Sequence, residues 1–219
     1  PPILQMHAQV ALSAALAASG RWREAEAELT EALTRPKDFV CHMLKAKAEY
    51  ASLRLRQGRT QEAAAVLNGV EDHLEVVEPY ARILIAHGHL GQAGQRLRTA
   101  ILTLGTDRMR TAPLLALLVD LHVQSGDLSA AQGELDRLQN LAAACPSKEI
   151  GAQAYLAAGR LAHAQRQPAV SHLQAALALL PPPHRPPLTP HTRLELPRPS
   201  PPTAPPPPAP PPPPAAPPT

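Results

Sequence analysis

The chain has 219 residues and a formal net charge of only +3, from 21 basic and 18 acidic side chains. Residues 181–219 hold 21 of its 28 prolines, so this tail is not expected to pack as a globule. The preceding 180 residues are rich in alanine and leucine and contain only five aromatic side chains. Because β-sandwiches and barrels use β-branched and aromatic residues, this composition excludes them and favours closely packed helices.

Five stretches of the first 180 residues have the pattern of helices, and each precedes a copy of one recurring phrase. The expected helices are residues 4–19, 40–57, 74–87, 112–125 and 149–163. The phrase is a glycine, a residue two positions later that is most often apolar, and then Ala, Leu and a small or apolar residue at fixed offsets. Its copies begin 38, 30, 38 and 38 residues apart and are Gly20-Trp22-Ala25-Leu29-Ala32, Gly58-Thr60-Ala63-Leu67-Val70, Gly88-Leu90-Ala93-Leu97-Ala100, Gly126-Leu128-Ala131-Leu135-Leu138 and the degenerate Ala164-Arg166-Ala169-Leu173-Ala176.

The phrase has a physical interpretation as the turn and second helix of a helix hairpin. Glycine ends a helix because the closing residue enters the left-handed region, which glycine reaches without strain. In the second helix, Ala and Leu four residues apart share one face, where Ala allows close approach and Leu fills the space beyond. We therefore expect burial between helices at Trp22, Leu29, Leu67, Leu97 and Leu135. Each hairpin leaves one apolar face uncovered, so the sequence predicts an all-α solenoid of about five stacked hairpins over residues 1–180, with no sheet.

These residues resemble the tetratricopeptide repeat (TPR). The matching positions are the glycine, the alanine five residues on and the small residue seven beyond it, and they match best in the first and third copies. A proline after the second helix occurs only at Pro36, and most units are longer than the ~34 residues of that family. We interpret the fold as TPR-like; the alternative is an unrelated stack of amphipathic hairpins.

A second resemblance lies in the sequence segments around the copies of the phrase. Residues 53–59 (LRLRQGR), 71–73 (EDH) with Pro79 behind them, 112–120 (APLLALLVD), 125–128 (SGDL), 159–162 (GRLA) and 173–177 (LQAAL) look like the helical-repeat region of actinobacterial LuxR-family transcriptional regulators. The resemblance covers roughly residues 20–196. It implies a sensing or scaffold segment that holds an effector or partner protein.

The chain departs from that family at both ends. The family carries a C-terminal helix-turn-helix, and its large members carry an upstream ATPase module. This sequence has no G-x-x-x-x-G-K-[ST] phosphate loop, and prolines follow residue 180. We therefore expect no ATP hydrolysis and no specific DNA binding by this chain alone. The alternative function is a stand-alone TPR-type scaffold for protein–protein interaction with a polyproline tail.

A candidate binding groove follows from helix geometry. In TPR-like stacks the first helix of each hairpin lines the concave side. Positions 13, 10, 6 and 2 residues before each glycine then share one face. The candidate partner-binding set taken from these positions is Lys45, Ser52, Arg56, Glu78, Arg82, Asp120 and Gln124. The alternative is an ordinary solvated face.

Other chemistry is sparse. Cys41 and Cys145 form no CxxC motif, so neither a disulfide nor a zinc site is expected, and reduced thiols suggest a cytoplasmic protein. No histidine pair with a carboxylate has metal-ligand spacing, and Glu71-Asp72-His73 is interpreted as a polar turn between hairpins. No apolar run is long enough for a membrane span. We expect no enzyme activity, no cofactor and no membrane; the expected partner is a protein, a peptide or a small effector.

The tail, residues 181–219, has two interpretations. Its runs of proline favour a disordered or polyproline II segment, which could be a spacer or a ligand for aromatic grooves. Alternatively, it is not native and arose from a frameshift, since alanine codons of a GC-rich gene become proline codons one base out of frame. In either case the predicted organisation is a repeat domain at 1–180 and a proline-rich tail at 181–219.

Overall fold

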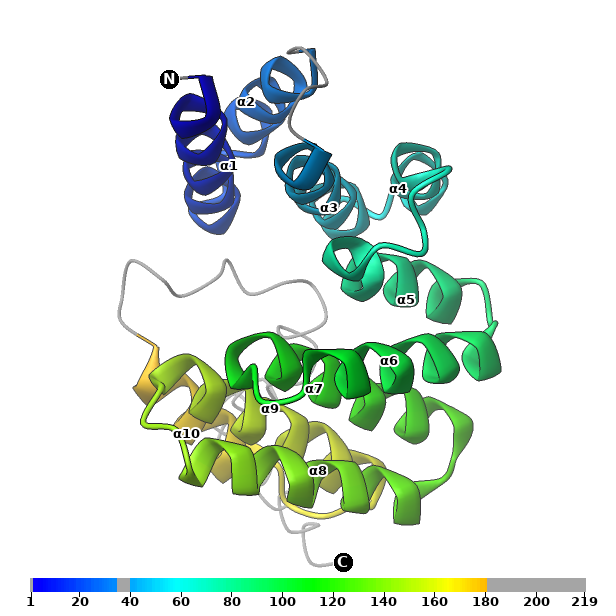
Figure 1. Cartoon of the computed structure of the whole chain (residues 1–219). Coiled ribbons are helices and arrows are strands. Elements are labelled where there is room, and N and C mark those ends of the chain that lie inside the picture. The colour runs from blue at the N-terminus through cyan, green and yellow to red at the C-terminus, as the bar shows by residue number, and fades with distance from the viewer. Residues whose placement is uncertain (1, 35–39, 181–219) are drawn as a thin grey trace, which may run out of the picture.

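The computed structural model describes residues 2–34 and 40–180, which form ten α-helices, one short 3-10 helix and no strand (Figure 1). The helices follow one another as antiparallel hairpins, so the predicted all-α repeat architecture with about five hairpins is confirmed. The predictions for the tail lie outside the described residues. The hairpins are α1 (Pro2–Ala18) with α2 (Trp22–Thr34), α3 (Val40–Arg56) with α4 (Thr60–Leu67), η1 (Leu74–Val76) and α5 (Val77–Ala86) with α6 (Leu90–Leu104), α7 (Arg108–Ser125) with α8 (Leu128–Ala143), and α9 (Lys148–Ala164) with α10 (Val170–Leu179).

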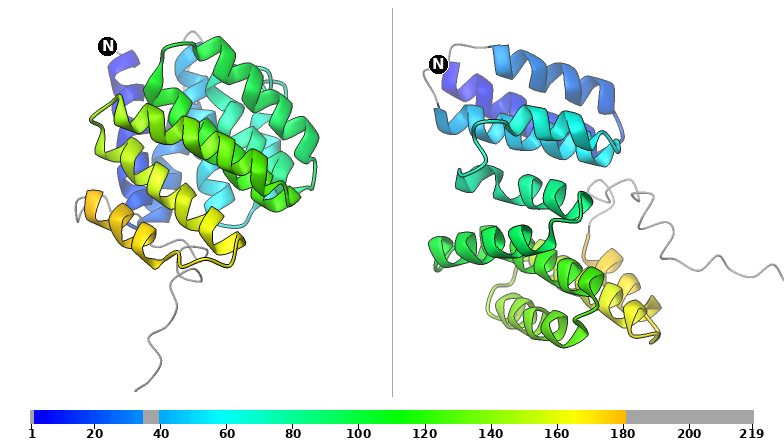
Figure 2. Two further views of the ribbon diagram at one scale, coloured as in Figure 1. Left: turned by 90° about the horizontal axis from the view of Figure 1, so that it is seen from below. Right: turned by 90° about the vertical axis from the view of Figure 1, so that its right-hand side faces the viewer.

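The hairpins stack in chain order along a curve. The first helix of each hairpin packs against both helices of the hairpin before it: α3 against α1 and α2, α5 against α3 and α4, α7 against α5 and α6, and α9 against α7 and α8. In Figure 1, α1 and α3 lie toward the inner side of the curve, whereas α2, α4 and α8 lie along its outer side. Figure 2 shows the same stack from below and from its right-hand side. We call the surface formed by α1, α3, α5, α7 and α9 the inner face.

The glycine of each phrase ends the first helix as predicted. Gly20, Gly58, Gly88 and Gly126 have φ of 81°, 77°, 80° and 79°, in the left-handed region. In each turn the next residue donates its backbone N–H to a carbonyl in the last helical turn, as His89 does to Leu84 at 2.8 Å. This closure satisfies carbonyl groups that the helix end leaves without a partner.

The second helices bury the predicted apolar stripe. Ala25, Ala63, Ala93 and Ala131 are fully buried, and Leu29, Leu67, Leu97 and Leu135 are buried beside them. Trp22 differs from the prediction, because it is only partly buried against the cluster that contains Leu29. It is the first residue of α2, and it packs against a cluster that includes Leu16 of α1 and Leu53 of α3.

The fifth hairpin corrects the position of its degenerate phrase. Helix α9 continues through Ala164, and the residue that takes the left-handed conformation is Arg166, with φ of 59°. Gln167 donates its backbone N–H to the Ala162 carbonyl at 2.8 Å. In the other turns, the residue after the glycine makes the equivalent hydrogen bond. Leu173 and Ala176 are buried as predicted, and Leu173 follows the left-handed residue by seven positions, whereas the leucine of the other copies follows it by nine. The sequence pattern could not locate the turn because the glycine that marks it is absent.

The second hairpin explains the short spacing of 30 residues in the repeat. Helix α4 has only eight residues and ends at Leu67, so Val70 of the second phrase lies in the following turn. Gly69 reverses the chain there with φ of 77°. Asp72 and His73 are exposed and Glu71 is partly so, which agrees with the predicted polar turn.

Candidate functional site

All seven residues of the predicted groove lie on first helices of the stack. Lys45, Ser52 and Arg56 lie on α3, Glu78 and Arg82 on α5, and Asp120 and Gln124 on α7. Lys45, Arg82 and Gln124 are exposed, whereas the other four are partly buried. These three first helices belong to successive hairpins, and each packs against the next.

Charged side chains on the inner face are paired along and between helices. Within α5, Arg82 contacts Glu78 at 3.0 Å, and within α3, Arg56 lies 3.9 Å from Glu49. Between helices, Arg160 of α9 donates to Asp120 of α7 at 2.6 Å. A further pair, at 3.6 Å, joins Arg110 of α7 to Glu75 of η1. The inner face therefore presents both charges, and its ion pairs connect neighbouring hairpins.

The predicted set did not include four of these partners: Glu49, Glu75, Arg110 and Arg160. Arg160 is six residues before Arg166, as Asp120 is six residues before Gly126. The offset rule would have found Arg160 if the fifth turn had been placed at Arg166. Glu49 is nine residues before Gly58, at an offset that the rule did not use.

Glu49 has a perturbed acidity. Burial raises the pKa of its carboxyl above the ordinary value, and Glu78 on the neighbouring helix raises it further, while Arg56 opposes both effects. Its side chain is nevertheless 37% exposed, so it remains in reach of solvent. The accessible inner face therefore carries a carboxyl that holds its proton more tightly than a fully solvated one does.

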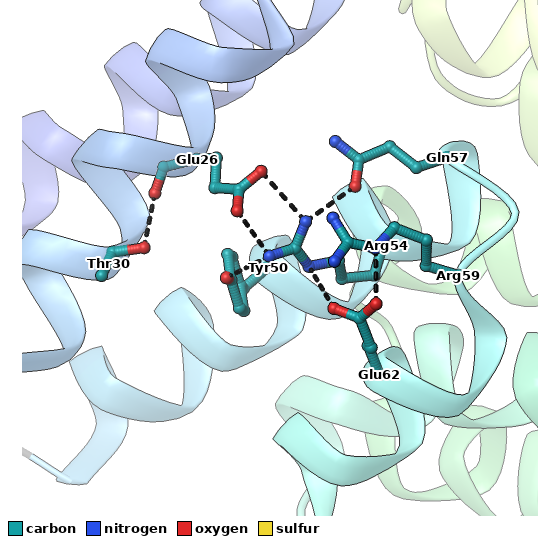
Figure 3. A network of polar contacts seen from close by, with 7 residues as sticks. All are labelled: Glu26, Thr30, Tyr50, Arg54, Gln57, Arg59 and Glu62. Carbon is teal, nitrogen blue, oxygen red and sulfur yellow. Dashed lines mark hydrogen bonds and ion pairs between the residues drawn. The ribbon is translucent and has the colours of Figure 1, made fainter.

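A polar network around the buried Arg54 joins the first two hairpins (Figure 3). Arg54 of α3 is only 5% exposed and donates to both carboxylate oxygens of Glu26 on α2, at 2.6 and 3.0 Å. It also donates to Tyr50 and Gln57 and lies 3.4 Å from the carboxylate of Glu62 on α4. Because one guanidinium joins α2, α3 and α4, this network is a structural clamp and not an open binding site.

An open depression of about 610 Å³ lies beside the turn that follows α4. Arg96 of α6 crosses it, donating to the Asp72 carboxylate at 2.6 Å and to the Glu71 carbonyl at 3.1 Å, above the ring of Tyr80. Its lining is Asp72, Leu74, Val77, Gln92, Gln95, Arg96, Thr99, Ala100 and Thr103. Sequence reasoning did not anticipate this feature. The charge of Arg96 is already engaged by the protein itself.

One histidine contact was also missed. His7 of α1 and His42 of α3 have their Nε2 atoms 2.6 Å apart, with the rings edge to face. Burial, then the neighbouring His7 and Lys45, lower the pKa of His42. Within the described residues no group of three or more His, Cys, Asp or Glu side chains could hold a metal ion. Cys145 is a partly buried free thiol, and the side chain of Cys41 lies outside the described part of the chain.

Comparison with known proteins supports the fold. A TPR-like repeat protein from Podosopora anserina, described as a putative kinesin light chain with nearly identical repeats, superposes with a TM-score of 0.55 at 19% identity. The match covers 82% of this chain and 96% of that one, and a single-residue variant of the same protein gives 0.54 at 19% identity, over 81% and 95% of the two chains. A tetratricopeptide repeat protein from Parabacteroides merdae has a TM-score of 0.45 at 15% identity, over 80% and 65% of the two chains. No family model and no curated protein matches the sequence.

These comparisons place the chain in the class of TPR-like helical-repeat folds. No helix in the described part is long and apolar enough to cross a bilayer. At such low identity the likeness concerns architecture, so function has to be argued from this chain's own surfaces.

Proposed function

We propose that the chain is a protein-interaction scaffold of the TPR type that holds a partner protein or peptide along its inner face. The observation that supports this most directly is the row of exposed polar side chains on successive first helices, represented by Lys45, Arg82 and Gln124. A stack of helices offers such a row to an extended segment without forming an enclosed pocket. The chain then acts by binding and not by catalysis, in the cytoplasm.

The row is suited to a segment of mixed charge. Lys45 and Arg82 are exposed cations, while the Glu49 carboxyl is accessible and has a raised pKa. A partner with one charge sign only would meet like charge along part of the face. Electrostatic complementarity of this kind contributes mainly to specificity and association rate.

The test is a triple substitution of the inner face, Lys45→Ala, Arg82→Ala and Gln124→Ala. The matched control is Arg23→Ala, Arg137→Ala and Gln139→Ala, which removes the same kinds of exposed side chain from second helices. Quantitative affinity capture from the source cells should show partners bound to the parent and to the control, with at least ~10-fold loss for the inner-face variant, equal to ~1.4 kcal/mol. Equal capture by both variants would refute the inner face as the binding surface.

A narrower role is also proposed: the sensing or scaffold segment of a LuxR-type transcriptional regulator. It is supported by the resemblance of residues 53–59, 112–120 and 173–177 to the repeats of that family. In this role the chain would read no DNA sequence itself, because residues 1–180 carry nearly balanced charge. A titration should show at most weak, salt-sensitive binding, and a ratio of ~10³ or more between one duplex and its scrambled control would overturn that expectation.

A further inference from the structure

The first helix of every hairpin carries a set of residues that meets the hairpin before it. Counted back from the left-handed residue of the turn, these positions are 12, 8 and 5 residues earlier. We call them the incoming face of the hairpin. The four later hairpins have incoming faces made by Ala46, Tyr50 and Leu53, by Val76, Tyr80 and Ile83, by Leu114, Leu118 and Leu121, and by Ala154, Ala158 and Leu161.

These later incoming faces are covered by the preceding hairpin. Ala46 is buried in a cluster with Ala32 of α2, and Leu53 in a cluster with Leu16 of α1 and Leu29 of α2. The corresponding residues of η1, α5, α7 and α9 are buried as well, and only the two tyrosines, Tyr50 and Tyr80, are partly buried. One interface geometry is thus used four times along the described part of the stack.

The first hairpin has the same face, but nothing in the described part of the chain covers it. At 12, 8 and 5 residues before Gly20 stand Ala8, Leu12 and Ala15, and all three are exposed, Leu12 by 47%. Ala11 on the same side is exposed, and so is Leu4, by 64%. A terminal repeat that caps a solenoid needs a polar outer face, whereas this face is apolar and built from small residues and leucine as an internal interface is.

We infer that the incoming face of α1 is an internal interface of a longer solenoid, covered by a further helix hairpin that precedes α1 in the same polypeptide. The occupant would present the apolar surface that α1 and α2 present to α3, with residues equivalent to Leu16, Leu29 and Ala32. A second copy of the chain fits this face less well. Paired through α1, it would offer a single helix where every other incoming face meets two, and a stable interface needs about 800 Å² from each partner.

Whether the incoming face of α1 can bind a further hairpin is tested by adding a second copy of residues 1–38 in front of Pro1. This copy adds a hairpin at the 38-residue spacing that separates the first two copies of the phrase. Amide exchange in residues 4–18 should slow by at least ~10-fold, because the helix becomes buried on both sides. Leu12→Glu in the original α1 should abolish this gain. Leu102→Glu on α6, where the leucine is 82% exposed, should leave it intact. Unchanged exchange in the extended chain would overturn the inference.

Two further experiments test whether the segment that covers this face belongs to the same polypeptide or to a second copy of the chain. They use the unextended chain and the natural protein. Sedimentation of the chain should show a monomer; a dimer abolished by Leu12→Glu would make a second copy the occupant and overturn the inference. Peptide mapping of the protein isolated from its source cells should find at least ~30 residues before Pro1 that include the glycine, alanine and leucine phrase, since repeat units have ~20–45 residues. A natural N-terminus within a few residues of Pro1 would also overturn it. None of these outcomes depends on the inner face.

Discussion

At the scale of single residues, the left-handed turn position shows how one backbone requirement recurs through the chain. Glycine meets it in four turns, and Arg166 meets it in the fifth, with φ of 59°. A residue with a Cβ atom in this region costs about 1–2 kcal/mol, which Arg166 incurs and the glycines avoid. The fifth hairpin therefore carries local strain that the other four do not.

Replacing that residue should relieve the strain. Arg166→Gly is expected to raise the free energy of unfolding by about 0.5–1 kcal/mol, less than the full strain because glycine is more flexible in the unfolded chain. The reverse control is Gly126→Ala, where an added Cβ meets nothing within 4 Å, so its effect is conformational alone. It should lower stability by about 1 kcal/mol. Urea denaturation measures both, and a destabilised Arg166→Gly variant would contradict the assignment of the turn.

The acidity of Glu49 makes a pH-dependent prediction. Its pKa is raised above the ordinary 4.5, so the folded protein holds this proton more tightly than the unfolded chain does. Its contribution to stability is therefore full below 4.5 and is lost as the pH rises through the folded pKa. Glu49→Gln should gain stability relative to the parent at neutral pH, and the gain should shrink toward pH ~4, where the parent carboxyl is also protonated.

Urea denaturation across this pH range checks the difference. The control is Glu28→Gln, on the second helix α2 and away from the inner face. Its stability is measured at the same pH values, so that the change with pH can be compared between the two variants. A gain for Glu49→Gln that is the same at acid and neutral pH would show that the substitution acts through packing and not through the charge.

At the scale of elements, each second helix is held by a narrow stripe of small and large apolar residues. In α6, Ala93 and Leu97 are fully buried, whereas Leu102 on the same helix is 82% exposed. The position of the apolar stripe, and not the overall hydrophobicity of α6, therefore determines which face of α6 is buried. For this reason the four-residue spacing of Ala and Leu predicted the buried face.

Truncation of the stripe should destabilise the stack. Leu97→Ala is expected to lower the free energy of unfolding by about 2–5 kcal/mol, because it removes a fully buried side chain and leaves a cavity. The same change at Leu102 should cost less than ~0.5 kcal/mol. Chemical denaturation of the two variants compares them directly, and similar losses would show that the buried face of α6 is wrongly assigned.

At the scale of the whole molecule, stability comes from interfaces between neighbouring hairpins. The described residues form several clusters of buried side chains along the stack, and each joins adjacent hairpins. Nearest-neighbour contacts of this kind make a solenoid extendable, since every hairpin uses the same incoming face. This construction also lets neighbouring first helices combine their exposed polar residues into one inner face.

The sequence predicts that the proline-rich tail contributes nothing to this stack. Deletion of residues 183–219 should leave the melting temperature of the repeat domain almost unchanged, because polyproline segments bury little apolar surface and form no internal hydrogen bonds. Thermal unfolding monitored by circular dichroism makes the comparison. A drop of several degrees would contradict the prediction, since ~1 kcal/mol shifts a domain of this size by ~2–4 °C.

The sequence by itself determined the helical hairpins, their number and the buried stripe, because glycine at a helix end and Ala–Leu spacing are local signals. It did not locate the fifth turn, because arginine does not favour the left-handed conformation. Arg166 adopts this conformation because of the surrounding hairpin. Only the tertiary structure decided which charges meet. Arg160 pairs with Asp120, and His7 lies beside His42, across helices far apart in the chain. The tertiary structure also decided that Ala8, Leu12 and Ala15 are exposed. The residues at the same positions in the four other hairpins are covered because another hairpin precedes them in the stack, and the local sequence does not show whether such a neighbour is present.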